Sequence, residues 1–278
     1  MERIPFGIRR LDTAIDGGAP SGSVVLLSGE AGAGAREFIY TAALMNGLVG
    51  TDPDLFELYY GELADGATPP PEVHYLSFTA ERAQLRREMS LAMDDEIVDS
   101  AIDSVTFHDL SPEYFRLSPV PREWYARQTA RITDLGNDEN RGTVPEVLGD
   151  TLTDHAPGNL VIIDSIADLI DAPAEELGWD DIPVLLKGIS RAAFEWGGMV
   201  LVHINRESLD ARRHGQLVDA ADGTLLFRWE SGGSTRNRTM VVKQFRGVLS
   251  RIEAENIVQF ETEISDSGFD ISDVRKIR

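Results

Sequence analysis

The sequence contains no cysteine, so disulfide bonds, thiol nucleophiles and thiolate metal sites are all excluded. It also contains no apolar run long enough to cross a membrane, and its first residues, MERIPFGIRR, lack the hydrophobic core of a signal peptide. We therefore expect an intracellular, cytoplasmic protein without a membrane partner.

Lysine is almost as scarce as cysteine. Lys187, Lys243 and Lys276 are the only lysines, and 26 basic residues oppose 47 acidic ones, which gives a formal net charge of −21. Such a surface stays hydrated when salt screens its charge and repels itself when salt is low. The composition resembles that of proteins from halophilic archaea, and it also fits an ordinary acidic soluble protein.

Histidine occurs five times, with no H-x-x-x-H or H-E-x-x-H spacing that would place two ligands on one helix face. We expect these side chains to be satisfied core or surface residues, and we assign no metal site. They are His74, His108, His155, His203 and His214.

Buried strands and amphipathic helices alternate along the chain, which at 278 residues and 42% apolar content is ample for one large domain. A hairpin and two short strands follow. We expect a single α/β domain over 1–278, with a mainly parallel, helix-flanked sheet, an antiparallel C-terminal part and an acidic insert at about 51–72. The expected strands are 22–28, 73–78, 104–110, 159–165, 199–205, 223–230, 238–245, 255–261 and 268–272, and the expected helices are 35–48, 80–93, 143–156 and 181–196.

The stretch GSVVLLSGEAGAGAREF, from Gly22 to Phe38, has the strand, glycine turn and helix of a P-loop, whose backbone N–H groups cradle phosphate. The glycine frame is preserved at Gly29, Gly32 and Gly34. The pattern requires lysine and then serine or threonine, but this chain has Ala35 and Arg36. The cation for the phosphates and the hydroxyl that holds Mg²⁺ are therefore both replaced.

Three further motifs make the context more specific. FGIRRLDTAIDGG precedes the P-loop strand, NLVIIDS ends in Asp164 and Ser165, and VVKQFRG contains Lys243 and Arg246. Together they resemble the KaiC/RecA/RadA superfamily of P-loop ATPases, in order along almost the whole chain except about 51–72 and 112–142. The resemblance implies a RecA-like fold, with a nucleotide pocket at Gly29, Gly32, Gly34, Ala35, Arg36 and Asp164.

The resemblance also shows what is missing. Active members carry a catalytic glutamate at the end of the second strand, where this chain has Thr79 and Ala80, and Glu81 comes one residue late. Asp164, at the position of the Walker B aspartate, is retained. Because phosphoryl transfer depends on positioned charge, we expect no hydrolysis and assign no catalytic residue.

Arg36 leaves two interpretations open. Its guanidinium could grip phosphate bidentately in place of lysine and metal, which would allow ATP to bind without Mg²⁺. Alternatively, it forms a salt bridge with Asp164 across the pocket or points into solvent. Asp164 itself could be retained because it hydrogen-bonds the P-loop turn.

Basic residues are concentrated between 206 and 251, where the sequence has nine basic and five acidic residues. Within this stretch, NRESLDARRHGQ contains Arg212 and Arg213 and lies where RecA-like proteins place a DNA-contacting loop. No aromatic residue interleaves its arginines, so we expect an acidic protein or a second copy as partner and do not expect nucleic acid. Lys243 and Arg246 match the strand that in KaiC-like rings reaches the neighbouring subunit, or they simply solvate an edge strand.

These observations lead to three hypotheses for the function. The first is a regulatory or assembly subunit that does not hydrolyse ATP, alone or beside an active RecA/KaiC-like paralogue. The second is an ATP sensor that binds through Arg36 without turnover, and the third is a DNA-binding accessory protein. The insert segment DLFELYY is either a docking segment or a cap on the core.

Overall fold

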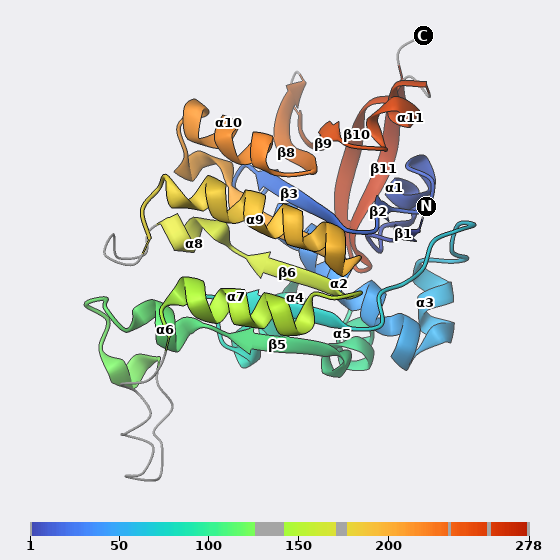
Figure 1. Ribbon diagram of the computed structural model, residues 1–278. Coiled ribbons are helices and arrows are strands. Elements are labelled where there is room, and N and C mark those ends of the chain that lie inside the picture. Colours follow the sequence, from blue (N-terminus) through green and yellow to red (C-terminus); the bar gives the residue numbers. More distant parts are fainter. Residues whose placement is uncertain (1, 126–141, 171–176, 233–234, 255–256, 277–278) are drawn as a thin grey trace.

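A nine-stranded sheet runs through the whole molecule, in the order β11-β10-β9-β8-β3-β7-β6-β4-β5 (Figure 1). The computed structural model describes residues 2–125, 142–170, 177–232, 235–254 and 257–276. The strands are β3 (Ser23–Gly29), β4 (Val73–Ser77), β5 (Val105–Asp109), β6 (Leu160–Asp164), β7 (Met199–Asn205), β8 (Gly223–Gly232), β9 (Thr235–Phe245), β10 (Ile257–Ser265) and β11 (Gly268–Lys276). Two short strands, β1 (Arg3–Ile4) and β2 (Ala19–Pro20), pair separately.

Strands β8, β3, β7, β6, β4 and β5 are parallel to one another. The pairs β8–β9, β9–β10 and β10–β11 are antiparallel. This confirms the predicted mainly parallel sheet with antiparallel C-terminal strands. Strand β3 is buried along its whole length because both faces of the sheet are covered. Its Val25 and Leu27 join one core, and Val24 and Leu26 join the other.

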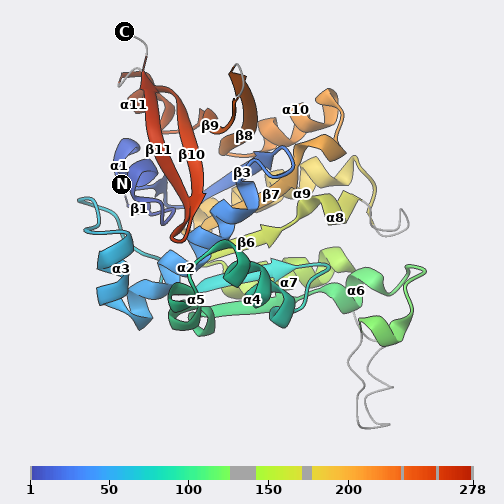
Figure 2. The same cartoon turned by 180° about the vertical axis from the view of Figure 1, so that it is seen from behind.

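Helices cover both faces of the sheet. On the face in front in Figure 1 lie α7 (Val144–His155), α8 (Ile166–Ile170), α9 (Asp181–Trp196) and α10 (Ala211–Ala220). On the face seen in Figure 2 lie α2 (Ala35–Thr51), α3 (Pro53–Tyr59), α4 (Arg82–Ala92) and α5 (Asp95–Ala101). The remaining helices are α1 (Arg9–Ala14), α6 (Ser111–Phe115) and α11 (Leu249–Ala254), with short 3-10 turns at Ile102–Ser104, Arg122–Trp124 and Arg206–Ser208. None of the helices in the described ranges is long and apolar enough to cross a membrane.

The insert at 51–72 is partly helical and packs against the core. Asp52 caps α3 by accepting a hydrogen bond from the N–H of Leu55, and Leu55, Phe56 and Tyr60 are buried. Leu58 is 73% exposed. The core-cap interpretation of this segment therefore holds for three of its apolar residues.

The stretch 205–216 is not the loop that we expected. A 3-10 turn and then α10 occupy it, and Asp210 caps α10 through a 2.8 Å hydrogen bond from the N–H of Arg213. The predicted hairpin is present, but its strands extend to Gly232 and from Thr235. The tip of the predicted turn, 233–234, lies outside the described residues.

Candidate functional site

Four parallel strands end at one edge of the sheet and bring the candidate site together. The register pairs Gly29 of β3 with Asn205 of β7, and Ser77 of β4 with Asp164 of β6. Carboxyl ends of parallel strands are where α/β sheets place ligand sites. Residues 30–34 form the turn that leads from β3 into α2.

The turn has the backbone geometry of a phosphate cradle. Gly32 and Gly34 have positive φ angles of 71° and 106°, which favour glycine. A Cβ at Gly34 would also lie 3.1 Å from the ring of Phe269. Within the described residues, the backbone N–H groups of Gly32, Gly34, Ala35 and Arg36 make no hydrogen bond. These donors at the start of a long helix are suited to an anion.

A cavity of about 330 Å³ lies in front of this turn. It contains one cation, Arg36, and two carboxylates, Glu30 and Glu37. Its lining residues are Gly29, Glu30, Ala31, Gly32, Gly34, Ala35, Arg36, Glu37, His203 and Asn205. The five residues predicted from the P-loop pattern are therefore brought together around one cavity.

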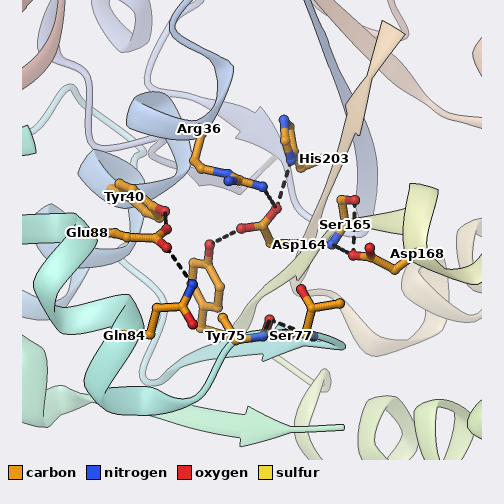
Figure 3. A network of polar contacts seen from close by, with 12 residues as sticks. Arg36, Tyr40, Tyr75, Ser77, Gln84, Glu88, Asp164, Ser165, Asp168 and His203 are labelled. Carbon is orange, nitrogen blue, oxygen red and sulfur yellow. Dashed lines mark hydrogen bonds and ion pairs between the residues drawn. The ribbon is translucent and has the colours of Figure 1, made fainter. Parts of the chain in front are cut away.

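Asp164 is held by side chains of its own chain (Figure 3). Its Oδ2 accepts a 2.6 Å hydrogen bond from the hydroxyl of Tyr75, and its Oδ1 lies 2.8 Å from Nδ1 of His203. The same Oδ1 is 3.5 Å from Nη2 of Arg36. Burial alone would raise the pKa of Asp164, but the hydrogen bond and charge of His203, with Arg36 and Tyr75, lower the pKa to about 2.

Arg36 bridges the carboxylate and the cavity. Its side chain is 52% exposed, whereas that of Asp164 is 10% exposed. The charge of Asp164 is the largest influence on Arg36 and raises its pKa. Beyond Arg36, the hydroxyl of Tyr40 donates a 2.6 Å hydrogen bond to Glu88. The salt-bridge interpretation of Arg36 is thus the arrangement that the structure has.

Two expectations about Asp164 and its surroundings were wrong or incomplete. Its hydrogen bonds within the described residues go to Arg36, Tyr75 and His203, and none goes to the turn at 29–34. Tyr75 and His203 were not predicted as site residues. Both precede the ends of predicted strands, but only the strand order shows that they flank Asp164.

Glu81 does not line the cavity at the turn. It is an exposed residue at the start of α4, and it borders a separate surface hollow with Gln84, Arg87 and Glu88. The N–H of Ala80 donates to Oγ of Ser77 at 3.0 Å, which fixes the turn after β4. The end of β4, where active relatives of the resembled family carry the catalytic glutamate, therefore presents no carboxylate to the cavity.

The predicted partner residues fall into two groups. Arg246 pairs with Asp222 at 2.9 Å, and Arg213 stacks on Trp179 with 4.9 Å between its guanidinium carbon and the ring centre. Arg212 and Lys243 are exposed. Burial, then the charges of Arg206, Lys243 and Arg228, lower the pKa of His214 on α10.

The five histidines fall into two groups. His203 pairs with Asp164 and His214 lies 2.8 Å from Oγ of Ser28, so these two are satisfied as expected. The other three, which are far apart in the sequence, are adjacent in space. They are His74, His108 and His155.

Comparisons with known proteins identify the fold. No family model and no curated protein sequence matches the chain. Among solved structures, the KaiC-like protein PH0186 from the hyperthermophilic archaeon Pyrococcus horikoshii OT3 superimposes with a TM-score of 0.61 and 17% sequence identity, over 98% of this chain and 99% of that one. The chain therefore has the RecA-like α/β fold in its KaiC-like form.

Proposed function

We propose that this RecA-fold protein does not hydrolyse ATP and acts as a regulatory or assembly subunit. The observation that supports this is the pairing of Asp164 with its own chain. In P-loop ATPases a carboxylate at this strand end helps to hold Mg²⁺. Here Arg36 occupies the position of the metal-binding hydroxyl and directs its charge at that carboxylate, 3.5 Å away. The residues present therefore do not fit a Mg²⁺ ion.

The missing parts act together. Ala35 cannot supply the lysine charge, Arg36 cannot supply the hydroxyl, and Glu81 lies outside the cavity. Removing one electrostatic contributor typically lowers a catalytic rate by about 10²–10³-fold. With three contributors absent, we expect no turnover that differs from the uncatalysed rate.

The test is an ATPase assay on the purified protein in concentrated KCl with Mg²⁺. We expect no phosphate release above that of buffer. The matched variant is the double substitution Ala35→Lys with Arg36→Thr, which restores the P-loop pattern and should increase Mg²⁺-dependent ATP binding because Asp164 is released from Arg36. The proposal would be overturned if the unmodified protein hydrolysed ATP and the Asp164→Asn variant did not.

The regulatory or assembly role requires a partner, either a second copy of the chain or an active RecA/KaiC-like paralogue. The exposed cations Arg212 and Lys243 lie in the stretch 206–251, where basic residues outnumber acidic ones in an otherwise acidic protein. We expect Arg212→Glu with Lys243→Glu to weaken association, measured by light scattering during gel filtration. Arg87→Glu with Arg191→Glu, exposed on α4 and α9, is the matched control. This surface would be excluded if the protein still associated with Arg212→Glu and Lys243→Glu but not with Arg87→Glu and Arg191→Glu.

A second candidate function is nucleotide binding without metal. It is favoured by the N–H groups of Gly32, Gly34, Ala35 and Arg36, which have no partner in the described part of the chain, and by the half-exposed side chain of Arg36. A phosphate in the cavity would compete with Asp164 for the guanidinium. No comparable observation favours the DNA-binding hypothesis, since the expected loop is largely helix α10 and Arg213 is stacked on Trp179.

Calorimetric titration of ATP in concentrated KCl, with and without Mg²⁺, separates the two candidates. Binding that is indifferent to Mg²⁺, lost in Arg36→Ala and strengthened in Asp164→Asn would establish Arg36 as the phosphate clamp. Loss of binding in Asp164→Asn but not in Arg36→Ala would refute that mechanism. Absence of heat and of a thermal shift would leave the subunit role alone.

A further inference from the structure

Three histidines from three separate elements meet near the outer edge of the sheet. His74 is on β4, His108 is on the edge strand β5, and His155 is the last residue of α7, which lies across this end of the sheet (Figure 1). None of the three lines the cavity at the P-loop turn. The cluster is therefore a feature that the proposed function leaves unused.

The ring nitrogens are close enough to share one ion. Nδ1 of His74 lies 3.1 Å from Nε2 of His108, and one nitrogen from each of the three rings lies within 4.8 Å of the others. The centre of the His155 ring is 4.8 Å from the centres of both other rings. Zinc–nitrogen bonds of about 2.0–2.1 Å in a tetrahedral site place ligand nitrogens about 3.3 Å apart. The pair formed by His74 and His108 already has nearly this spacing, and a ring nitrogen of His155 lies within 4.8 Å of both.

A carboxylate orients the buried member of the cluster. Oε2 of Glu72 lies 3.1 Å from Nε2 of His74. Because a carboxylate accepts hydrogen bonds, this contact places the proton of His74 on Nε2 and turns the lone pair of Nδ1 towards His108. A carboxylate behind a histidine is the arrangement that orients histidine ligands in metal sites.

Asn159 completes the support of the cluster. Its side-chain N–H group donates a 2.9 Å hydrogen bond to the carbonyl oxygen of His155, and its Oδ1 accepts a 3.2 Å hydrogen bond from the backbone N–H of Glu72. His74 is buried, whereas His108 and His155 are half-buried. The cluster therefore has one fixed member and two members that solvent, and an ion from solvent, can reach.

We propose that His74, His108 and His155 bind one transition-metal ion, with Zn²⁺ as the best fit, and that Glu72 positions His74. Three imidazoles suit Zn²⁺ better than Mg²⁺ or Ca²⁺, which prefer oxygen. They would leave the fourth position of a tetrahedral site to water. The ion would join β4, the edge strand β5 and α7, which makes it a cross-link in a chain without disulfides.

The test uses the complete chain without a histidine tag, freed of metal by a chelator and kept in concentrated KCl. Co²⁺ is titrated while its visible absorption is recorded, and Zn²⁺ is then added as competitor. We expect one Co²⁺ per chain with the strong absorption of tetrahedral geometry, displaced by one Zn²⁺. Zn²⁺ should also raise the thermal midpoint of unfolding, because it binds the folded state.

Variants decide which residues are responsible. His108→Gln and His155→Gln should each abolish the tetrahedral spectrum, and Glu72→Ala should weaken Zn²⁺ binding about 10–100-fold. His214→Gln removes a histidine outside the cluster and should change neither the tetrahedral spectrum nor the affinity for Zn²⁺. The thermal midpoint without metal shows that each variant is folded. Absence of saturable binding in the unmodified chain, or binding that survives both His108→Gln and His155→Gln, would overturn the proposal.

Discussion

Asp12 shows how one side chain joins segments that are distant in the sequence. It is 1% exposed, and it accepts hydrogen bonds from the N–H groups of Phe6 and Gly7 at 2.8 and 3.0 Å. The hydroxyl of Tyr60, in the insert, donates a third at 3.1 Å. The aspartate of the motif that precedes the P-loop strand is therefore a structural residue that anchors both the N-terminal segment and the insert.

Asp12→Ala should lower the free energy of unfolding by about 3 kcal/mol, because buried donors that lose their acceptor each cost about 1–3 kcal/mol. Urea denaturation followed by circular dichroism measures the change. Thr13→Ala, at an exposed position of the same helix, is the control. A loss for Asp12→Ala no larger than that of the control would contradict the structural role.

At this scale the sequence identified some of the site and not the rest. Ala35, Arg36 and Asp164 could be predicted because each occupies a fixed place in a linear pattern. Tyr75 and His203 could not, because their contacts with Asp164 depend on which strands are neighbours. A sequence motif specifies the spacing of residues within one element. A network of side chains also depends on the order in which several strands lie in the sheet.

The C-terminal hairpin supports the P-loop turn from outside. The indole N–H of Trp229 on β8 donates to the carbonyl oxygen of Ala31, and Nε of Arg238 on β9 donates to that of Gly32, both at 3.0 Å. The guanidinium of Arg238 also stacks 4.6 Å from the ring centre of Trp229. Two carbonyl groups of the turn are thereby bound to the hairpin, whereas the N–H groups of Gly32 and Gly34 have no hydrogen-bond partner among the described residues.

Removing this support should loosen the turn. We expect Arg238→Ala to increase hydrogen exchange about tenfold at the amides of Ala33 and Phe38, which donate to the carbonyl oxygens of Glu30 and Gly34. A tenfold change corresponds to about 1.4 kcal/mol, in keeping with the loss of one hydrogen bond with a charged donor. Exchange measured by mass spectrometry gives the result. Arg275→Ala, which removes ion pairs with Glu230 and Glu261 on the same sheet, is the control. Equal exchange in the turn for both variants would refute the support.

Elements were predicted more fully than side-chain networks. The helix at 181–196 and the strand at 199–205 have the predicted bounds, because amphipathic spacing and the stop at Gly197 are local signals. Helix α10 was missed because the family resemblance placed a loop there, although Asp210 is a good helix cap. The histidine cluster was missed because no periodicity links β4, β5 and α7.

The whole molecule is dominated by its formal charge of −21. Ion pairs compensate little of this charge, because exposed pairs such as Arg82 with Asp103 and Arg86 with Asp99 contribute little to stability. Repulsion among the carboxylates therefore opposes the folded state. Its range falls from about 10 Å at 0.1 M salt to about 3 Å at 1 M.

We expect the thermal midpoint to rise steeply with KCl up to about 1 M, by about 2–4 °C for each kcal/mol gained. Differential scanning calorimetry across a salt series measures it. If screening is the cause, NaCl and KCl of equal ionic strength should act alike, and neutral sucrose should not reproduce the steep part of the curve. A midpoint that does not change with salt would contradict the expectation.

The support of the turn by Trp229 and Arg238 also sets an order of events during synthesis. Gly32 and Arg238 are bonded across 206 positions of sequence. At about 5–20 residues per second, a ribosome needs about 10–40 s to add that length. For most of that interval the nascent chain carries the glycine turn without strands β8 and β9, so the segment that most resembles a nucleotide site is among the last to reach its final shape.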